Sequence, residues 1–123
     1  MASELRVDTL KDSSGSNSVG MAYVAGGSAK AWVNFNGTGT IAARDSLNLS
    51  SLTDVGTGNY RVVFSSALAN DDYVGSGTFD WSNNGNQINC TPNTTAQGLV
   101  LILENNAFVD RSTVNASYLG DLA

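Results

Sequence analysis

Histidine is absent from this sequence, and cysteine and proline occur once each. Without histidine the chain lacks the usual general base of enzymes and the most common metal ligand. Nucleophilic catalysis by a serine or cysteine paired with histidine is therefore excluded. The single cysteine, Cys90, excludes an internal disulfide and supplies too few ligands for a structural zinc site. We expect Cys90, on a predicted strand, to be a small buried residue.

Straight-chain polar residues are also scarce, because Glu, Lys and Gln occur twice each. These are the residues on which the exposed faces of helices depend. By contrast, Asn, Ser, Thr and Gly make up 52 of the 123 residues. Thr favours strands, whereas Asn, Ser and Gly favour turns. The composition predicts an all-β protein and argues against a helix of any length.

Positive charge is sparse, with six Lys and Arg residues against 11 Asp and Glu and a net charge of −5. Binding to nucleic acid needs clustered cations that neutralise phosphates, and these six are scattered. The longest apolar run, Leu99–Leu103, is far shorter than the roughly 20 residues of a membrane-spanning helix. Residues 1–6 lack the charged-then-apolar order of a signal peptide. We therefore expect no nucleic-acid partner, no membrane partner and no secretion.

Acidic residues offer the only candidates for catalysis or metal binding. Asp71 and Asp72 are adjacent carboxylates, which with Asn70 or Asp54 have the oxygen ligands that Ca²⁺ prefers. The spacing of an EF-hand loop is missing, so we interpret the pair as a solvated turn. A glycosidase needs two carboxyl groups across a cleft, and nothing in the sequence singles out such a pair. The sequence thus predicts no catalytic residue, no metal site and no cofactor, and we expect no enzyme activity.

Composition divides the chain into two parts. Residues 4–11 alternate apolar and polar over their first half, which predicts a short strand. Residues 12–18 are small and polar, which predicts a flexible linker, and a second glycine-rich stretch follows at residues 25–28. We predict an N-terminal arm over residues 1–28, used for docking or oligomer contacts. A compact body over residues 29–123 follows.

Alternating segments and turns recur through the body. Three hairpin turns are predicted from their Asn, Asp and Gly residues: Asn36–Gly39, Asp54–Asn59 and Asn83–Asn86. The strands that the alternation predicts cover residues 31–35, 40–43, 47–51, 60–65, 73–81, 87–91, 99–103 and 114–118. Trp81 is in phase with Tyr73 and Phe79 and is predicted to be in the core, while Pro92 is placed in a connection that interrupts no strand. This spacing predicts an antiparallel β-sandwich or a jelly-roll-like domain.

The run Leu99–Leu103 is apolar on both faces, unlike the other predicted strands. Such a strand is either central in a sandwich or covered by a partner subunit. We therefore predict an oligomer interface at three residues of this strand, Leu99, Leu101 and Leu103. In the arm, a strand can dock by adding to an exposed sheet edge. The predicted arm contacts are Leu5, Val7 and Leu10.

Trp32 lies on the opposite face of its predicted strand from Ala31, Val33 and Phe35. Three interpretations of Trp32 stay open: a subunit interface, the core, or contact with a ligand. Aromatic rings can stack against sugar rings, so the ligand would be a glycan. This interpretation would make the protein a carbohydrate-binding module that recognises a host surface polysaccharide.

Several segments resemble a module that recurs in tail-fibre and related virion proteins of bacteriophages, marine phages among them. In the body these segments are Ser28–Thr40, Arg44–Ser46, Leu52–Asp54 and Gly56–Tyr60. The opening segments, Ser3–Asp12 and Gly15–Asn17, are similar to the start of such proteins. The resemblance covers residues 3–36, continues to about residue 81 and is weak beyond that point. Its most specific part is the Lys-Ala-Trp-X-X-Phe-Asn-Gly run at residues 30–37.

The resemblance implies a structural protein of the virion, usually a homotrimer, in a tail fibre or spike. It implies no catalytic residue. Long fibres continue into a shaft and a tip, which favours an adaptor or short fibre here and leaves a capsid decoration or head-fibre protein as the alternative. The expected partners are copies of the same chain, other virion proteins of the tail or capsid, and a host surface glycan. The expected location is the virion, after synthesis in the cytoplasm of the host bacterium.

Overall fold

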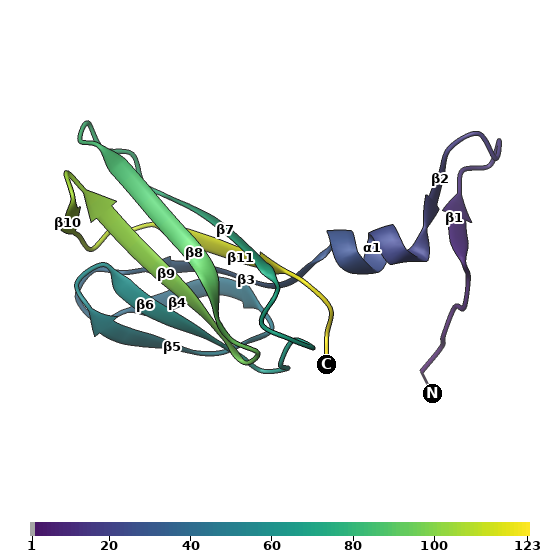
Figure 1. The fold of residues 1–123 in the computed structure, drawn as a ribbon, viewed down its shortest axis with the longest axis horizontal. Helices are drawn as coiled ribbons and strands as arrows, with labels where there is room; N and C mark the ends of the chain where they lie inside the picture. The colour runs from purple at the N-terminus through teal and green to yellow at the C-terminus, as the bar shows by residue number, and fades with distance from the viewer. Residues whose placement is uncertain (1) are drawn as a thin grey trace.

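Apolar and polar residues alternate along the strands of the body, so that each of its two antiparallel sheets has one apolar face (Figure 1). The structure is a computed structural model and describes residues 2–123. The four-stranded sheet has the order β4 (Ala42–Leu47), β3 (Ala29–Asn36), β11 (Val114–Leu119), β7 (Val74–Phe79). The five-stranded sheet contains β5 (Leu49–Gly56), β6 (Asn59–Phe64), β9 (Gln97–Glu104), β8 (Asn86–Thr94) and β10 (Ala107–Phe108). In it β6 pairs with β5 and β9, and β9 also pairs with β8 and β10. The predicted antiparallel sandwich is confirmed.

The core lies between the two sheets. The four-stranded sheet contributes Ala31, Val33, Phe35, Val114, Ala116 and Tyr118. The five-stranded sheet contributes Tyr60, Val62, Phe64, Cys90, Val100 and Ile102. Aromatic rings meet edge to face across the layers, with 5.1 Å between the centroids of Phe35 and Tyr60. Such pairs add about 0.5–1.5 kcal/mol to the burial of apolar area. The predicted burial of Cys90 is confirmed.

Two of the three predicted turns close hairpins within one sheet. The first joins β3 to β4, and the second joins β5 to β6. In the first turn the positive φ falls on Gly39, at 60°, and not on Asn36 or Gly37 as the Asn-Gly signal predicted. The reason is that the Asn36 side chain accepts hydrogen bonds from the Thr38 amide at 3.0 Å and hydroxyl at 2.6 Å. This side-chain turn lengthens the loop, so β4 begins at Ala42 and not at residue 40.

The third predicted turn crosses from one sheet to the other. It joins β7 of the four-stranded sheet to β8 of the five-stranded sheet, so β8 does not return beside β7. The chain leaves the sheet at Asp80, whose amide donates to the Thr113 carbonyl at 3.0 Å. Trp81 therefore lies beyond the end of β7, where the alternation no longer applies. The prediction that Trp81 is in the core is wrong, because Trp81 is 81% exposed.

Pro92 also departs from its predicted place in a connection. It lies inside β8, opposite Gly98, and a bulge follows it. The missing N–H of proline disturbs little at this point, because β8 pairs through one side only, with β9. Edge strands and bulges are the positions at which sheets tolerate proline.

The arm begins with a hairpin of two short strands, β1 (Thr9–Lys11) and β2 (Ser18–Gly20). Residues 12–17 form the turn between them, so the prediction of a flexible linker is wrong. The Asp12 carboxylate organises the turn by accepting hydrogen bonds from the Ser14 hydroxyl, the Ser16 amide and the Asn17 side chain. The hydrogen bonds from Asn17 and Ser14 lower the pKa of Asp12.

A short helix, α1 (Met21–Gly27), connects the hairpin to β3. The composition argued against any helix, so this element was missed. It has seven residues, and no side chain caps its first turn. Among residues 2–123, no helix has the length and apolar character to cross a membrane. Figure 1 shows the hairpin and α1 standing away from the sandwich, which leaves the arm largely without contacts to the body.

Candidate functional site

The residues predicted as contacts lie on three separate surfaces. The first surface is the arm, with Leu5, Val7 and Leu10. The second is the outer face of the four-stranded sheet, with Trp32 on β3. The third is the outer face of the five-stranded sheet, with Leu99, Leu101 and Leu103 on β9. The structure therefore does not bring the predicted set together into one site.

The arm exposes apolar side chains with no partner in the chain. Leu5 is 79% exposed, and Leu10 is 41% exposed although it lies on β1. Leu10 pairs in register with Val19 of β2, and Tyr23 of α1 is 79% exposed. Sequence reasoning missed Val19 and Tyr23, because the hairpin and helix that display them were not predicted. The arm thus displays several exposed apolar side chains among polar and charged ones, such as the exposed Arg6–Glu4 pair.

Three leucines of β9 form a row that we call the leucine stripe: Leu99, Leu101 and Leu103. The residues between them, Val100 and Ile102, are fully buried in the core, so the leucines face outward. Each leucine is half-buried. The first alternative for this strand is confirmed, since β9 is central in its sheet, whereas coverage of its apolar outer face by a partner stays a prediction.

The surroundings of the leucine stripe are almost without charge. In register with it lie Asn59 and Arg61 on β6 and Gln87, Asn89 and Thr91 on β8. Arg61 donates to the Asn93 side chain at 3.0 Å. A groove of about 420 Å³ runs between β8 and β9 beside Leu101 and Leu103. This face has an apolar centre and a mostly polar rim, which includes the cation Arg61 beside Leu99 and the exposed Phe108 beside Leu103.

Trp32 occupies the opposite face of the sandwich. It is half-buried and pairs in register with Leu47 of β4 on one side and Ser117 of β11 on the other. It does not belong to the core between the sheets. The core interpretation of Trp32 is therefore wrong, whereas contact with a subunit and contact with a ligand both stay predictions.

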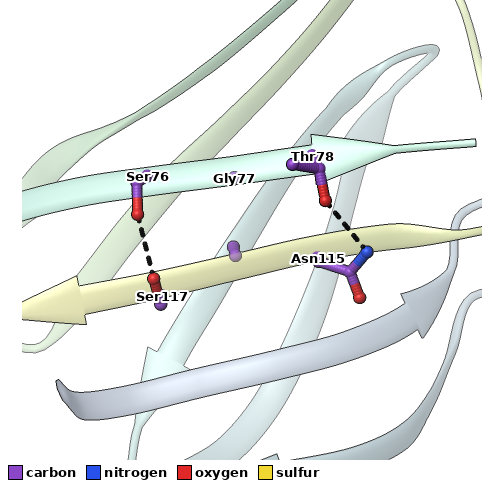
Figure 2. Close-up of a pocket in the computed structure, with 6 residues that line it drawn as sticks. Ser76, Gly77, Thr78, Asn115 and Ser117 are labelled. Atoms are coloured by element: carbon purple, nitrogen blue, oxygen red, sulfur yellow. Dashed lines mark hydrogen bonds between the residues drawn. The ribbon is translucent and has the colours of Figure 1, made fainter.

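A shallow hollow of about 250 Å³ lies on this same face, over β7 and β11 (Figure 2). Four small polar side chains line it: Ser76, Thr78, Asn115 and Ser117. The hydroxyls of Ser76 and Ser117 are 3.0 Å apart, and the Asn115 amide donates to the Thr78 hydroxyl at 3.1 Å. Sequence reasoning missed this hollow, because its two walls are far apart in the chain and consist of residues that are common everywhere in it.

The hydrogen bonds continue past the hollow toward β4. The Asn34 amide donates to Asn115 Oδ1 at 2.5 Å, and Asn34 Oδ1 accepts from Arg44 at 3.4 Å. Arg44 also donates to the Ser112 carbonyl at 2.5 Å. Together with the bond from Asn115 to Thr78, the result is a polar ladder across the four strands β7, β11, β3 and β4. Each primary amide has two N–H groups, so Asn34 and Asn115 each keep one beyond the ladder.

The cysteine and the acidic pair that the sequence singled out lie in different surroundings, one buried and the other exposed. Burial raises the pKa of Cys90 to about 12, which disfavours the thiolate that a nucleophile needs. Asp71 and Asp72 lie exposed in the predicted turn, where the Asp72 amide donates to Asn70 at 3.0 Å. Within residues 2–123, no group of three or more His, Cys, Asp and Glu side chains is placed to hold a metal ion.

Compared with models of protein families, with curated proteins and with solved structures, the chain has no significant match. The resemblance to phage virion modules therefore stays a prediction that depends on the residues named above.

Proposed function

We propose that this chain is a structural protein of a bacteriophage virion, assembled as a homotrimer in a tail fibre or spike. The observation that carries the proposal is a pair of uncovered apolar surfaces, the leucine stripe and the arm. Surfaces of this kind mark sites of contact with other proteins. In this proposal the stripe joins the copies and the arm attaches the trimer to the particle.

The leucine stripe suits a three-fold axis. Residues next to such an axis meet their own copies, so a charge there would face the same charge. Leu99, Leu101 and Leu103 are uncharged, and the flanking residues of β8 are amides and a hydroxyl that can pair with each other. On the β6 flank the cation Arg61 is turned to the Asn93 side chain, to which it donates at 3.0 Å. An apolar centre with a polar rim is also the usual anatomy of a protein interface. Trp32 then lies outside the trimer, because it is on the other face of the sandwich.

The arm suits attachment to another virion protein. Its strands β1 and β2 form a two-stranded sheet, so each has an unpaired edge to which a partner strand can add. Leu5, Leu10 and Tyr23 supply apolar area for the same contact. Since the arm stands away from the body, a partner can reach it without disturbing the sandwich.

The oligomeric state and one substitution test the trimer. Light scattering at micromolar concentration should give three times the mass of the chain. Leu101→Asp should dissociate the trimer, because it places three carboxylates around the axis, whereas Leu47→Asp, on the opposite face, should leave the mass unchanged. A monomeric wild-type protein, or a trimer that tolerates Leu101→Asp, would contradict the proposal.

A capsid decoration or head-fibre protein would use the same two surfaces at another place on the particle. Electron microscopy of virions with gold-labelled protein separates the two locations. Label on the tail supports the fibre or spike, and label spread over the head supports decoration of the capsid.

A further inference from the structure

We propose that the hollow over β7 and β11, together with Trp32, is a binding site for a neutral saccharide chain. This site is distinct from the leucine stripe and from the arm, and it stays on the outside of the proposed trimer. Its ligand is defined by chemistry, as a chain of uncharged sugar rings with hydroxyl groups. The shape of the hollow, its hydrogen-bonding groups and its lack of charge all fit such a ligand.

The shape comes from small residues beside a large one. Ser117 pairs in register with Trp32 on one side and with Ser76 on the other. The two serines leave space above the sheet, and Trp32, which does not line the hollow itself, is the register neighbour of Ser117 on β3. A sugar ring placed over Ser76 and Ser117 would meet the half-buried indole along one side. Aromatic rings offer an apolar surface with a polar edge, which suits the mixed character of a sugar.

The hydrogen-bonding groups match a polyhydroxylated ligand. The hydroxyls of Ser76 and Ser117 can each donate or accept, and Asn34 and Asn115 each have one N–H group beyond the ladder. Figure 2 shows the Ser117 and Asn115 side chains on the same side of β11, with Ser76 and Thr78 beside them on β7. A few convergent polar groups around a hollow are typical of small-molecule sites.

The electrostatics favour an uncharged ligand. None of the six residues that line the hollow is ionisable. The nearest cation on the ladder, Arg44, is held by the Ser112 carbonyl and the Asn34 side chain. The net charge of −5 would further oppose an acidic polysaccharide.

The site is also preorganised. All four polar residues of the hollow lie on paired strands, and β11 is held between β3 and β7. Ladder hydrogen bonds fix the two asparagine side chains before a ligand arrives. Binding therefore requires little ordering of the protein, which lowers its entropic cost.

The test is a titration of the full-length ¹⁵N-labelled protein with neutral hexasaccharides: α-1,4-glucan, β-1,4-glucan and β-1,4-mannan. We expect saturable chemical-shift changes at the Trp32 indole N–H and at the amides of Asn115 and Ser117 with at least one of them. Loss of the aromatic surface in Trp32→Ala should weaken that binding by about tenfold. Ser117→Phe should abolish it by filling the hollow.

Tyr23→Ala removes an exposed aromatic residue of the arm and is the matched control, which should bind as the wild type does. Thermal melts verify that each variant is folded, and light scattering verifies that each keeps the oligomeric state of the wild type. No saturable change with any of the three hexasaccharides would overturn the proposal. Shifts centred on Trp81, and lost in Trp81→Ala, would also overturn it by moving the site to the β7–β8 loop. Neither result would bear on the trimer or on the arm.

Discussion

At the scale of single residues, the buried phenol groups of tyrosines help to join the two sheets. The Tyr60 hydroxyl lies 2.6 Å from Asp110 Oδ1 and 2.8 Å from the Gly37 carbonyl, so it ties β6 to two loops. Burial, followed by the hydrogen bond and charge of Asp110, raises the pKa of Tyr60. Burial also raises the pKa values of Tyr73 and Tyr118. All three groups stay uncharged in the folded protein at ordinary pH.

These shifts predict loss of stability in alkali. Cys90 has an ordinary pKa of 9.0 and a folded pKa of about 12. For it and the three tyrosines the folded pKa exceeds the unfolded pKa, so stability is complete below about pH 9 and falls as the pH rises further. Each group contributes a slope of up to about 1.4 kcal/mol per pH unit. Urea unfolding at pH 8 and pH 11 should show a clear fall in the midpoint, and an unchanged midpoint would contradict this account.

Residue character also decided which surface features the sequence could predict. The leucine stripe was predicted, because apolar residues at every position of a strand are unusual. The polar hollow was not predicted, because serine, threonine and asparagine are common throughout this chain and these four residues do not stand out in its sequence. Trp81 was placed in the core by its phase with Phe79, and the sequence had no sign that the strand ends at that phenylalanine.

At the scale of elements, β7 and β8 pack closely against each other. The two strands belong to different sheets, yet Cys90 of β8 lies directly beneath Gly77 of β7. A Cβ atom on Gly77 would lie 2.5 Å from the Asn115 carbonyl oxygen and 2.5 Å from Cys90 Sγ. Cβ atoms do not approach other atoms this closely, so β7 would have to move away from both β11, which carries the Asn115 carbonyl, and β8, which carries Cys90. The glycine permits the close packing of β7 against these two strands.

Gly77→Val should therefore destabilise the sandwich, although valine favours strands. Overpacking of this kind costs about 1–3 kcal/mol, and a backbone neighbour places the expected loss at the upper end. Ser76→Val, one position earlier and facing outward, should change stability by less than about 0.5 kcal/mol. Chemical denaturation of the two variants measures the difference. Equal stability would mean that β7 and β8 are farther apart than described.

Elements were predictable in the body and not in the arm, for a physical reason. Strands of the body bury one face, and burial imposes the alternation that the sequence displays. The hairpin of β1 and β2 depends instead on local hydrogen bonds to Asp12, and α1 buries no residue. The alternation over residues 4–11 predicted a strand there, of which only Thr9–Lys11 forms one, and neither the rest of the hairpin nor α1 leaves a periodic pattern. The β7–β8 crossing was missed because turn residues indicate where a chain bends and not which sheet it enters.

At the scale of the whole molecule, the core of the body does not depend on the arm. Every residue of the core cluster lies between Ala31 and Tyr118, so the arm contributes nothing to it. Deleting residues 2–24 should leave the melting temperature and the trimer unchanged, because the core and the leucine stripe remain. The same deletion should abolish cosedimentation of the purified protein with virions prepared without it. Cosedimentation equal to that of the full chain would show that the arm is not the anchor.

Both ends of the described chain leave the sandwich on one side. Figure 1 places residue 123 at the end from which α1 departs, and the Ala123 amide is held there by the Ala67 carbonyl at 3.1 Å. The β7–β8 loop, with Trp81, lies at the other end. A peptide inserted between Asn83 and Asn84 would thus be displayed at the tip most distant from the docking arm. A tag following residue 123 would lie at the same end of the sandwich as the arm, and in the proposed attachment it would be crowded against the partner.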